Sequence, residues 1–209
     1  MELVDYSLKV GGKLLLKDVN AVFEKNSINH ILGTNGVGKS SFAKSCVGMV
    51  KSFGEIIDNE EIILIGSSSN VPNEFSLNEL SKLLYNKFDE KKVKKIYELL
   101  KLNMISDDLK IKNMSDGQKQ KMKLLSFLAV SPKAIILDEF TNALDKISSL
   151  DLYEFFNEYV KKNDTTIINI THNLSDLEYM KGHYYYFSKL NILKVESKDE
   201  IIEKYVRGD

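Results

Sequence analysis

The stretch HILGTNGVGKSSFAK, His30 to Lys44, passes from an apolar run through three glycines into a segment of helical character. Within it, GTNGVGKS (Gly33–Ser40) satisfies the pattern G-x-x-x-x-G-K-[ST]. In this pattern the glycines let backbone N–H groups face a phosphate chain, the lysine reaches the terminal phosphates and the hydroxyl holds Mg²⁺. A helix that begins at Lys39 adds its positive end to the same anion. The stretch therefore predicts a strand, a phosphate-binding loop and a helix that together hold a nucleotide.

Nucleotide hydrolysis requires a second carboxylate near the metal and a group that activates water, and AIILDEF (Ala134–Phe140) supplies both. Asp138 ends an apolar run that predicts a buried strand, so it can hold Mg²⁺ through water. Glu139 follows directly and is placed to act as the general base. An acidic strand end that merely begins a loop is the alternative interpretation, and it would be favoured if the motif stood alone.

Two further segments change that balance. MSDGQ (Met114–Gln118) opens a predicted helix, and THN (Thr171–Asn173) follows the next apolar strand. With these segments in order, the chain resembles the ATP-binding subunit of ABC transporters over nearly its whole length. Gly33–Ser40 match the Walker A loop of that family, Met114–Gln118 its LSGGQ signature, and Ala134–Glu139 its Walker B strand with the catalytic glutamate. Asn142–Asp145 resemble the D-loop, and His172 lies where the family has its switch histidine.

The resemblance implies ATP and Mg²⁺ as cofactors and assigns the site residues. Catalytic roles fall to Glu139 and His172, with His172 contacting the γ-phosphate. The metal-binding residues it implies are Ser40, Asp138 and Asn70. The nucleotide-binding residues it implies are Gly33, Thr34, Asn35, Gly36, Val37, Gly38, Lys39, Ser40, Ser41, Val10, Ser115, Gly117, Gln118 and Asp145.

The signature also implies a second ATP-binding subunit, as a homodimer or a heterodimer. In the family this segment completes the site of the opposite subunit, so two monomers close over two ATP molecules. Physically, Ser115 as N-cap and the amides after it present a helix N-terminus to the partner's γ-phosphate. The resemblance further implies a transmembrane permease subunit as partner, which we expect to dock around Asn70 to Leu80 and the helices that follow.

Three residues depart from the family pattern. Val10 stands before Gly11 and Gly12, where the family has an aromatic side chain that stacks on adenine, and loss of that stack would weaken binding by roughly 1–3 kcal/mol. Asn70 lies nearest to the place of a glutamine that senses Mg²⁺, and its amide has a shorter reach. Asp116 replaces the first glycine of the signature. We expect Asp116 to point away from the partner's nucleotide and its charge to slow closure of the dimer.

The fold class follows from the order of the elements. Strands that alternate with helices imply parallel pairing, and the resemblance implies an α/β fold with a P-loop NTPase core, a mostly parallel sheet, an N-terminal antiparallel β subdomain and a small helical subdomain. The runs VNAVF and INHIL, between Val19 and Leu32, suggest a hairpin at the start of a sheet. Residues 1–209 are expected to form a single ABC ATPase domain, in which 1–70 and 131–209 make the catalytic core and approximately 71–130 the helical subdomain.

Composition limits the other function classes. The chain has 29 basic and 30 acidic residues, so its net charge of −1 gives no electrostatic reason to expect a nucleic-acid partner. Its single cysteine excludes an internal disulfide and a zinc site built from cysteines. No signal peptide and no run of about 18 apolar residues is visible. We therefore expect a cytoplasmic protein that is peripheral at the inner face of the cell membrane and contacts the membrane only through its partner.

The sequence thus predicts an ATP-binding and ATP-hydrolysing subunit that dimerises on ATP and powers a separate transmembrane subunit, with export of a peptide or drug as the expected task. Two alternatives stay open. One is a soluble ABC-type assembly ATPase that moves no solute. The other is a regulatory half of a heterodimer with low activity, which the departures at Val10, Asn70 and Asp116 favour.

Overall fold

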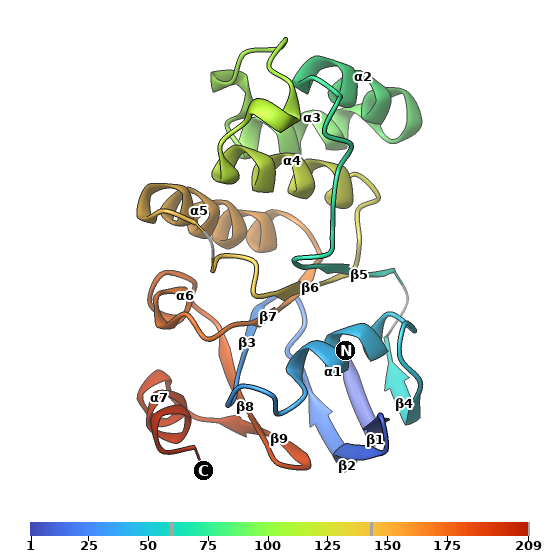
Figure 1. The fold of residues 1–209 in the computed structure, drawn as a ribbon, viewed down its shortest axis with the longest axis vertical. Coiled ribbons are helices and arrows are strands. Elements are labelled where there is room, and N and C mark those ends of the chain that lie inside the picture. Colours follow the sequence, from blue (N-terminus) through green and yellow to red (C-terminus); the bar gives the residue numbers. More distant parts are fainter. Residues whose placement is uncertain (59–60, 143, 209) are drawn as a thin grey trace.

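The chain folds into two sheets with helices between and beyond them, and the computed structural model describes residues 1–58, 61–142 and 144–208 (Figure 1). The strands are β1 Glu2–Val10, β2 Lys13–Val22, β3 Ile28–Leu32, β4 Ser52–Ile57, β5 Ile62–Ile65, β6 Ala134–Asp138, β7 Thr166–Ile170, β8 His183–Ser188 and β9 Asn191–Val195. The α-helices are α1 Lys39–Cys46, α2 Leu77–Lys87, α3 Glu90–Leu99, α4 Asp116–Leu128, α5 Lys146–Lys162, α6 Leu174–Tyr179 and α7 Lys198–Arg207. Two short 3-10 turns, η1 Leu102–Met104 and η2 Ile111–Asn113, lie between α3 and α4.

The larger sheet sets up the functional site. Its strand order is β5-β6-β7-β3-β8-β9, and every pair is parallel except β8 with β9. All residues of β3 and β7 are buried, as the apolar runs predict for central parallel strands. Because the carboxyl ends of parallel strands meet at one edge, the loop after β3, Asp138 at the end of β6 and the segment after β7 lie together.

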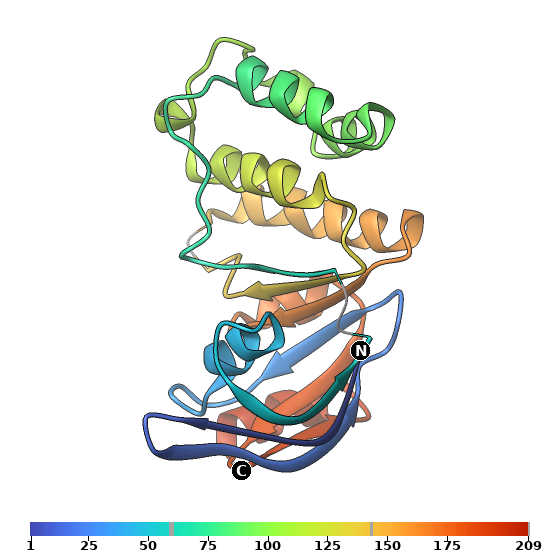
Figure 2. The same ribbon diagram turned by 90° about the vertical axis from the view of Figure 1, so that its right-hand side faces the viewer.

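The two faces of this sheet bury different partners. Ile135, Leu137 and Ile167 belong to a cluster that includes residues of α2 to α5, whereas Ile136 and Ile168 belong to one with α1 and the antiparallel sheet. This alternation follows from the two-residue period of a strand. Figure 2 shows the resulting layers, with α4 and α5 on one side of the large sheet and α1 with the small sheet on the other. The predicted α/β class with a mostly parallel sheet is confirmed.

The small sheet has the order β2-β1-β4 and is antiparallel, so the predicted N-terminal antiparallel part is also confirmed. The predicted hairpin of VNAVF with INHIL is wrong. β2 pairs with β1, while β3 lies between β7 and β8 in the other sheet. The physical reason is that INHIL is buried at every position, which a two-stranded hairpin cannot provide and the centre of a parallel sheet can.

The helices α2, α3 and α4 lie at the end of the molecule far from the small sheet (Figure 1). α2 begins at a capping box in which Ser76 accepts from the Glu79 amide and Glu79 accepts from the Ser76 amide. β8 and β9 form an antiparallel hairpin near the C-terminus, and Ser197 caps α7. Within the described part of the chain, no helix is long and apolar enough to cross a membrane.

Candidate functional site

The loop after β3 needs glycine for two different physical reasons. At Gly33 a Cβ would lie 2.4 Å from the carbonyl oxygen of Phe187, so the neighbouring strand β8 approaches too closely for any side chain. Gly36 and Gly38 have φ of +76° and +122°, in the left-handed region that favours glycine. The pattern glycines therefore keep the loop backbone bare and curved ahead of α1, which is the geometry of a phosphate cradle.

Lys39, the first residue of α1, is folded over this loop. Its Nζ donates to the carbonyl of Gly33 at 2.6 Å and to that of Thr34 at 3.1 Å, and the residue is only 6% exposed. Burial lowers the pKa of Lys39, while the nearby Glu139 and Asp138 act in the opposite direction. The ammonium group is thus held at the mouth of the loop by backbone oxygens.

Ser40 and Asp138 meet at the carboxyl edge of the sheet. The Ser40 hydroxyl donates to Asp138 Oδ1 at 3.2 Å, which joins the start of α1 to the end of β6. Burial raises the pKa of Asp138, and the adjacent Glu139 raises it further, while the bond from Ser40 lowers it. A hydroxyl and a carboxylate at this distance are the oxygen donors that Mg²⁺ prefers, so this pair fits the predicted metal position.

Glu139 and His172 are also brought together. Glu139 has a positive φ of 54°, and its amide donates to the Ile170 carbonyl at 2.9 Å, so the backbone turns sharply out of the sheet. His172 Nδ1 lies 3.2 Å from Glu139 Oε1. Both side chains remain accessible, at 43% for Glu139 and 41% for His172. The geometry gives an open carboxylate beside an imidazole, which suits a base and a phosphate contact.

The MSDGQ segment begins α4 as predicted. Ser115 is the N-cap and forms a capping box with Gln118, since the Gln118 amide donates to Ser115 Oγ and the Ser115 amide to Gln118 Oε1. Gly117 has no room for a side chain, because a Cβ there would lie 2.3 Å from Ser148 Oγ. This Ser148 hydroxyl donates to Asp145, the N-cap of α5. The signature helix and the α5 start are therefore fitted to each other.

The remaining predicted residues divide into those that reach the loop and those that do not. A cavity of about 340 Å³ is lined by Val10, Lys13, Leu15, Asn35, Gly36, Gly38, Lys39, Ser40, Ser41 and Glu139. Lys13 and Leu15 were not predicted. Lys13 pairs with Val10 across the β1–β2 turn, and Leu15 lies two residues further along β2. Asn70 is exposed, and no hydrogen bond or ion pair among the described residues joins it to Ser40 or Asp138. Of the predicted D-loop, Ala143 lies outside the described residues.

Comparison with known proteins supports the resemblance to ABC transporters independently of the site geometry. The probable peptide export ATP-binding protein YydI of Bacillus subtilis (strain 168) is 46% identical over 208 residues, which cover 99% of each chain. A family model described as ABC transporter matches residues 16–142. This chain belongs to the ABC transporter family. The ABC subunit is also 32% identical over 183 residues to the zinc import ATP-binding protein ZnuC of Rickettsia bellii (strain RML369-C), with 83% of this chain and 76% of that protein covered.

A solved structure supports the fold. The structure of cbiO1 from Clostridium perfringens, described as part of the ABC transporter complex cbiONQ, matches with a TM-score of 0.83 at 23% identity and covers 98% of this chain and 91% of that one. ATP-binding proteins of this family are ATPases, so the ABC subunit is an ATP-powered subunit of a transport complex. The bare glycine loop, the buried lysine and the Ser40–Asp138 pair are the features of this chain that fit ATP and a divalent cation.

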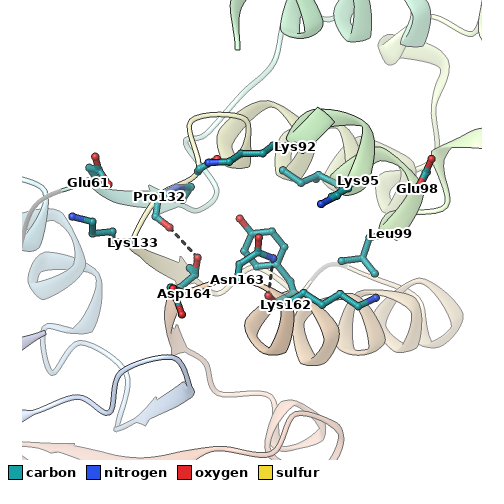
Figure 3. A pocket seen from close by; sticks show the side chains of 14 residues that line it. Glu61, Lys92, Lys95, Glu98, Leu99, Pro132, Lys133, Lys162, Asn163 and Asp164 are labelled. Carbon is teal, nitrogen blue, oxygen red and sulfur yellow. Dashed lines mark hydrogen bonds between the residues drawn. The ribbon is translucent and has the colours of Figure 1, made fainter. Parts of the chain in front are cut away.

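A larger cavity of the ABC subunit lies elsewhere. It has a volume of about 1070 Å³ and lies between α3, α5 and the segment before β6 (Figure 3). Lys92, Lys95, Lys133 and Lys162 stand around it together with Glu98 and Asp164. Residues 61, 133 and 165, at the amino ends of β5, β6 and β7, also line it, so it lies at the sheet edge opposite the glycine loop. Volume alone would therefore misplace the site, whereas the motif chemistry identifies the smaller cavity.

Proposed function

We propose that the ABC subunit powers the export of a peptide through a separate transmembrane permease. The relative that is 46% identical over the full length is named a probable peptide export ATP-binding protein, and this observation carries the proposal. The permease contacts the segment around Asn70 to Leu80 and the adjoining helices, and it holds the subunit at the inner face of the cell membrane. In this proposal residues 1–70 and 131–209 form the catalytic core and residues 71–130 the helical subdomain that faces the permease.

In the proposed hydrolysis, the amides of Gly33 to Ser41 bind the phosphates and Lys39 supplies positive charge to the terminal ones. Ser40 and Asp138 hold Mg²⁺, with Asn70 as a further metal contact, and the bound cation would neutralise charge on the phosphates. Glu139 accepts the proton of the attacking water, and His172 contacts the γ-phosphate. Support comes from the 3.2 Å distances in both the Ser40–Asp138 and the Glu139–His172 pairs.

The proposal includes a second ATP-binding subunit. Glu139 and His172 are open to solvent. At the N-terminus of α4, which the capping box of Ser115 begins, backbone N–H groups can donate to a phosphate bound by another subunit. The partner's site is then completed by Ser115, Gly117, Gln118 and Asp145. Val10 lies against the adenine of the ATP bound in its own subunit. ATP binding closes the dimer because it adds contacts that only the closed state makes, and hydrolysis removes them.

Replacement of Glu139, the proposed general base, tests the proposed site. Glu139→Gln should keep ATP binding and lower kcat by at least about 100-fold, because the amide cannot accept the proton. In the presence of ATP the variant should then accumulate as a dimer. Analytical ultracentrifugation with and without nucleotide measures this. Glu98→Gln is the matched control, since Glu98 lies on α3 at the opposite cavity. Hydrolysis by Glu139→Gln at the parental rate would contradict the assignment.

The cargo is tested separately. The subunit should co-purify from gently extracted membranes with a hydrophobic permease, and in vesicles that contain both chains its ATPase rate should rise with added peptide. The zinc importer relative sets the contrast, so Zn²⁺ is the comparison cargo. Stimulation by the metal and not by peptides would contradict peptide export and leave the ATPase assignment intact.

A further inference from the structure

A buried polar cluster includes residues next to the two chain segments that carry the proposed catalytic pair. At its centre is Asp176 of α6, which has no exposed surface. Its Oδ1 accepts from the Thr141 hydroxyl at 2.8 Å and from the Tyr153 hydroxyl at 2.8 Å, and its Oδ2 accepts from Asn169 Nδ2 at 3.0 Å. All three donors are themselves buried. The carboxylate is therefore fully enclosed and bonded on both oxygens.

The cluster extends to a fourth segment. The second hydrogen of Asn169 Nδ2 points to His30 Nδ1 at 3.2 Å, and His30 Nε2 donates to the Met180 carbonyl at 2.8 Å. His30 therefore acts as an acceptor toward Asn169, and the Asn169 amide is held by two acceptors at once. The Asn169 oxygen has no hydrogen-bond partner among the described residues. The orientation of the Asn169 amide is therefore fixed by the two hydrogen bonds that its NH₂ group donates.

The charge of Asp176 is not matched by a cation. Its three partners are neutral donors, and no ion pair within residues 1–58, 61–142 and 144–208 involves it. Transfer of a carboxylate from water into such a site is costly even when hydrogen bonds replace part of the hydration. An apolar side chain in place of Asp176 would leave three buried donors without an acceptor, so the carboxylate fixes the positions of these donors. The arrangement therefore points to a need for defined geometry.

The partners of Asp176 lie beside each segment that carries a proposed functional residue. Thr141 follows Glu139 by two positions, and Asn169 precedes His172 by three on the same strand end. Tyr153 is on α5, the helix that Asp145 caps. Figure 1 shows α6 beside α5 and β7, and Asp176 of α6 is bonded to Tyr153 of α5 and Asn169 of β7.

We propose that Asp176 is a positioning residue that sets the Glu139 segment and the His172 segment at a fixed separation for ATP hydrolysis. This inference rests on the proposed roles of Glu139 and His172. Both side chains are accessible, so contacts with neighbouring side chains constrain them little, and their distance of 3.2 Å depends on the backbones that carry them. Asp176 ties one backbone through Thr141 and the other through Asn169. A shift of about 1 Å between reacting groups costs roughly 100-fold in rate.

The test compares Asp176→Asn with the parent in the full chain. In either orientation the new amide leaves at least one of the three donors without its acceptor, so the cluster loosens while the shape is kept. We expect kcat to fall by about 10- to 100-fold and KM for ATP to stay within about 3-fold. Rates are expressed per folded molecule, from thermal melts in the same buffer. Asp164→Asn is the matched control, because Asp164 accepts from Asn26 at the opposite edge of the sheet.

A double variant separates positioning from general destabilisation. If Asp176 acts through His172, then Asp176→Asn should lower kcat far less in a His172→Ala background than in the parent. Equal kcat per folded molecule for Asp176→Asn and the parent would overturn the proposal. It would also be overturned if Asp176→Asn lowered kcat by the same factor in the His172→Ala background as in the parent. If Asp176→Asn does not fold, Thr141→Val with Tyr153→Phe removes two of the donors and is judged by the same readouts.

The outcome is also distinct from failure of the proposed site. Loss of activity in Glu139→Gln and His172→Ala together with an unchanged rate in Asp176→Asn would refute the positioning role alone. Parental activity in Glu139→Gln would refute the catalytic assignment and with it this inference.

Discussion

His30 shows at the scale of one residue how burial decides a protonation state. The imidazole is fully buried, stacks on Tyr184 with ring centroids 5.8 Å apart, and donates from Nε2 to the Met180 carbonyl. Burial lowers the pKa of His30 to about 4 from its ordinary value of 6.5, although the Met180 bond and the Asp176 charge oppose this. The folded chain therefore keeps this histidine neutral across the physiological range.

This depressed pKa predicts a loss of stability in weak acid. Below pH 6.5 the unfolded chain binds a proton at this residue that the folded chain does not bind until about pH 4. The free energy of unfolding should thus fall as the pH drops through this window, by up to about 1.4 kcal/mol per pH unit from His30. Urea unfolding at several pH values measures the slope, which should be smaller in His30→Gln. The same slope in His30→Gln and the parent would contradict the assignment, and His183→Gln serves as the control variant.

Val10 is a second residue whose identity has a measurable consequence. It lies at the tip of the β1–β2 hairpin and lines the nucleotide cavity with Lys13 and Leu15. Val10→Tyr should strengthen ATP binding by roughly 1–3 kcal/mol, because an aromatic ring can stack on the base. Titration with a fluorescent ATP analogue measures the change. Val22→Tyr, at the other end of β2 and outside the cavity, should leave affinity unchanged; equal gains in both variants would rule out stacking at Val10.

Sequence reasoning reached the residues whose roles are written in local patterns. The glycines, Lys39, Ser40, Asp138 and Glu139 share two contiguous motifs, and a contiguous motif can be read without knowing the fold. Asp176 could not be found this way, since its importance depends on donors from three separate segments. The only local signal was a carboxylate three positions after Asn173, the N-cap of α6.

Among the elements, α4 and α5 approach each other closely at Gly117. Gly117→Ala would place a Cβ 2.3 Å from Ser148 Oγ and 2.7 Å from Ser148 Cβ, so one helix must shift. The expected cost is about 1–3 kcal/mol of stability, measured by denaturant unfolding. Adding Ser148→Gly to Gly117→Ala should recover part of the loss. No recovery in the double variant would show that the strain lies elsewhere.

Helix starts could be predicted from neighbouring residues, whereas strand pairing could not. A capping box involves only four consecutive residues. Ser76 forms one with Glu79, and Ser115, the predicted N-cap of α4, forms another with Gln118. Strand partners depend on residues far away in the sequence. The runs around β2 and β3 therefore looked like a hairpin, although burial on both faces sends β3 into the parallel sheet.

At the scale of the whole molecule, the proposed dimer brings the start of α4, which carries Asp116, near a partner's triphosphate. The side chain is 78% exposed at the start of α4, with Lys119 Nζ 3.9 Å away. Asp116→Gly should raise the ATPase rate at low salt by removing like-charge repulsion, and the gain should shrink as salt shortens the screening length to about 10 Å at 0.1 M. Asp199→Gly, in the first turn of α7, is the matched control. A ratio of rates that does not change across the salt series would contradict this role.

The fold of the whole chain was predictable because its motifs occur in an order that one architecture explains. The division at residues 71 and 131 remains a prediction. In the structure, the helices α2 and α3 share one apolar cluster with α4, α5 and one face of the large sheet. This continuity cannot be read from the sequence, because a helix shows an apolar stripe whichever element it packs against.

Lys39 Nζ donates to the carbonyls of Gly33 and Thr34. In the proposed site, a bound phosphate would compete with these two backbone oxygens for the ammonium group. The binding affinity would then reflect the difference between the two sets of contacts. When the product leaves, the same two carbonyls could again accept hydrogen bonds from the ammonium group, so its charge would keep oxygen partners throughout the cycle.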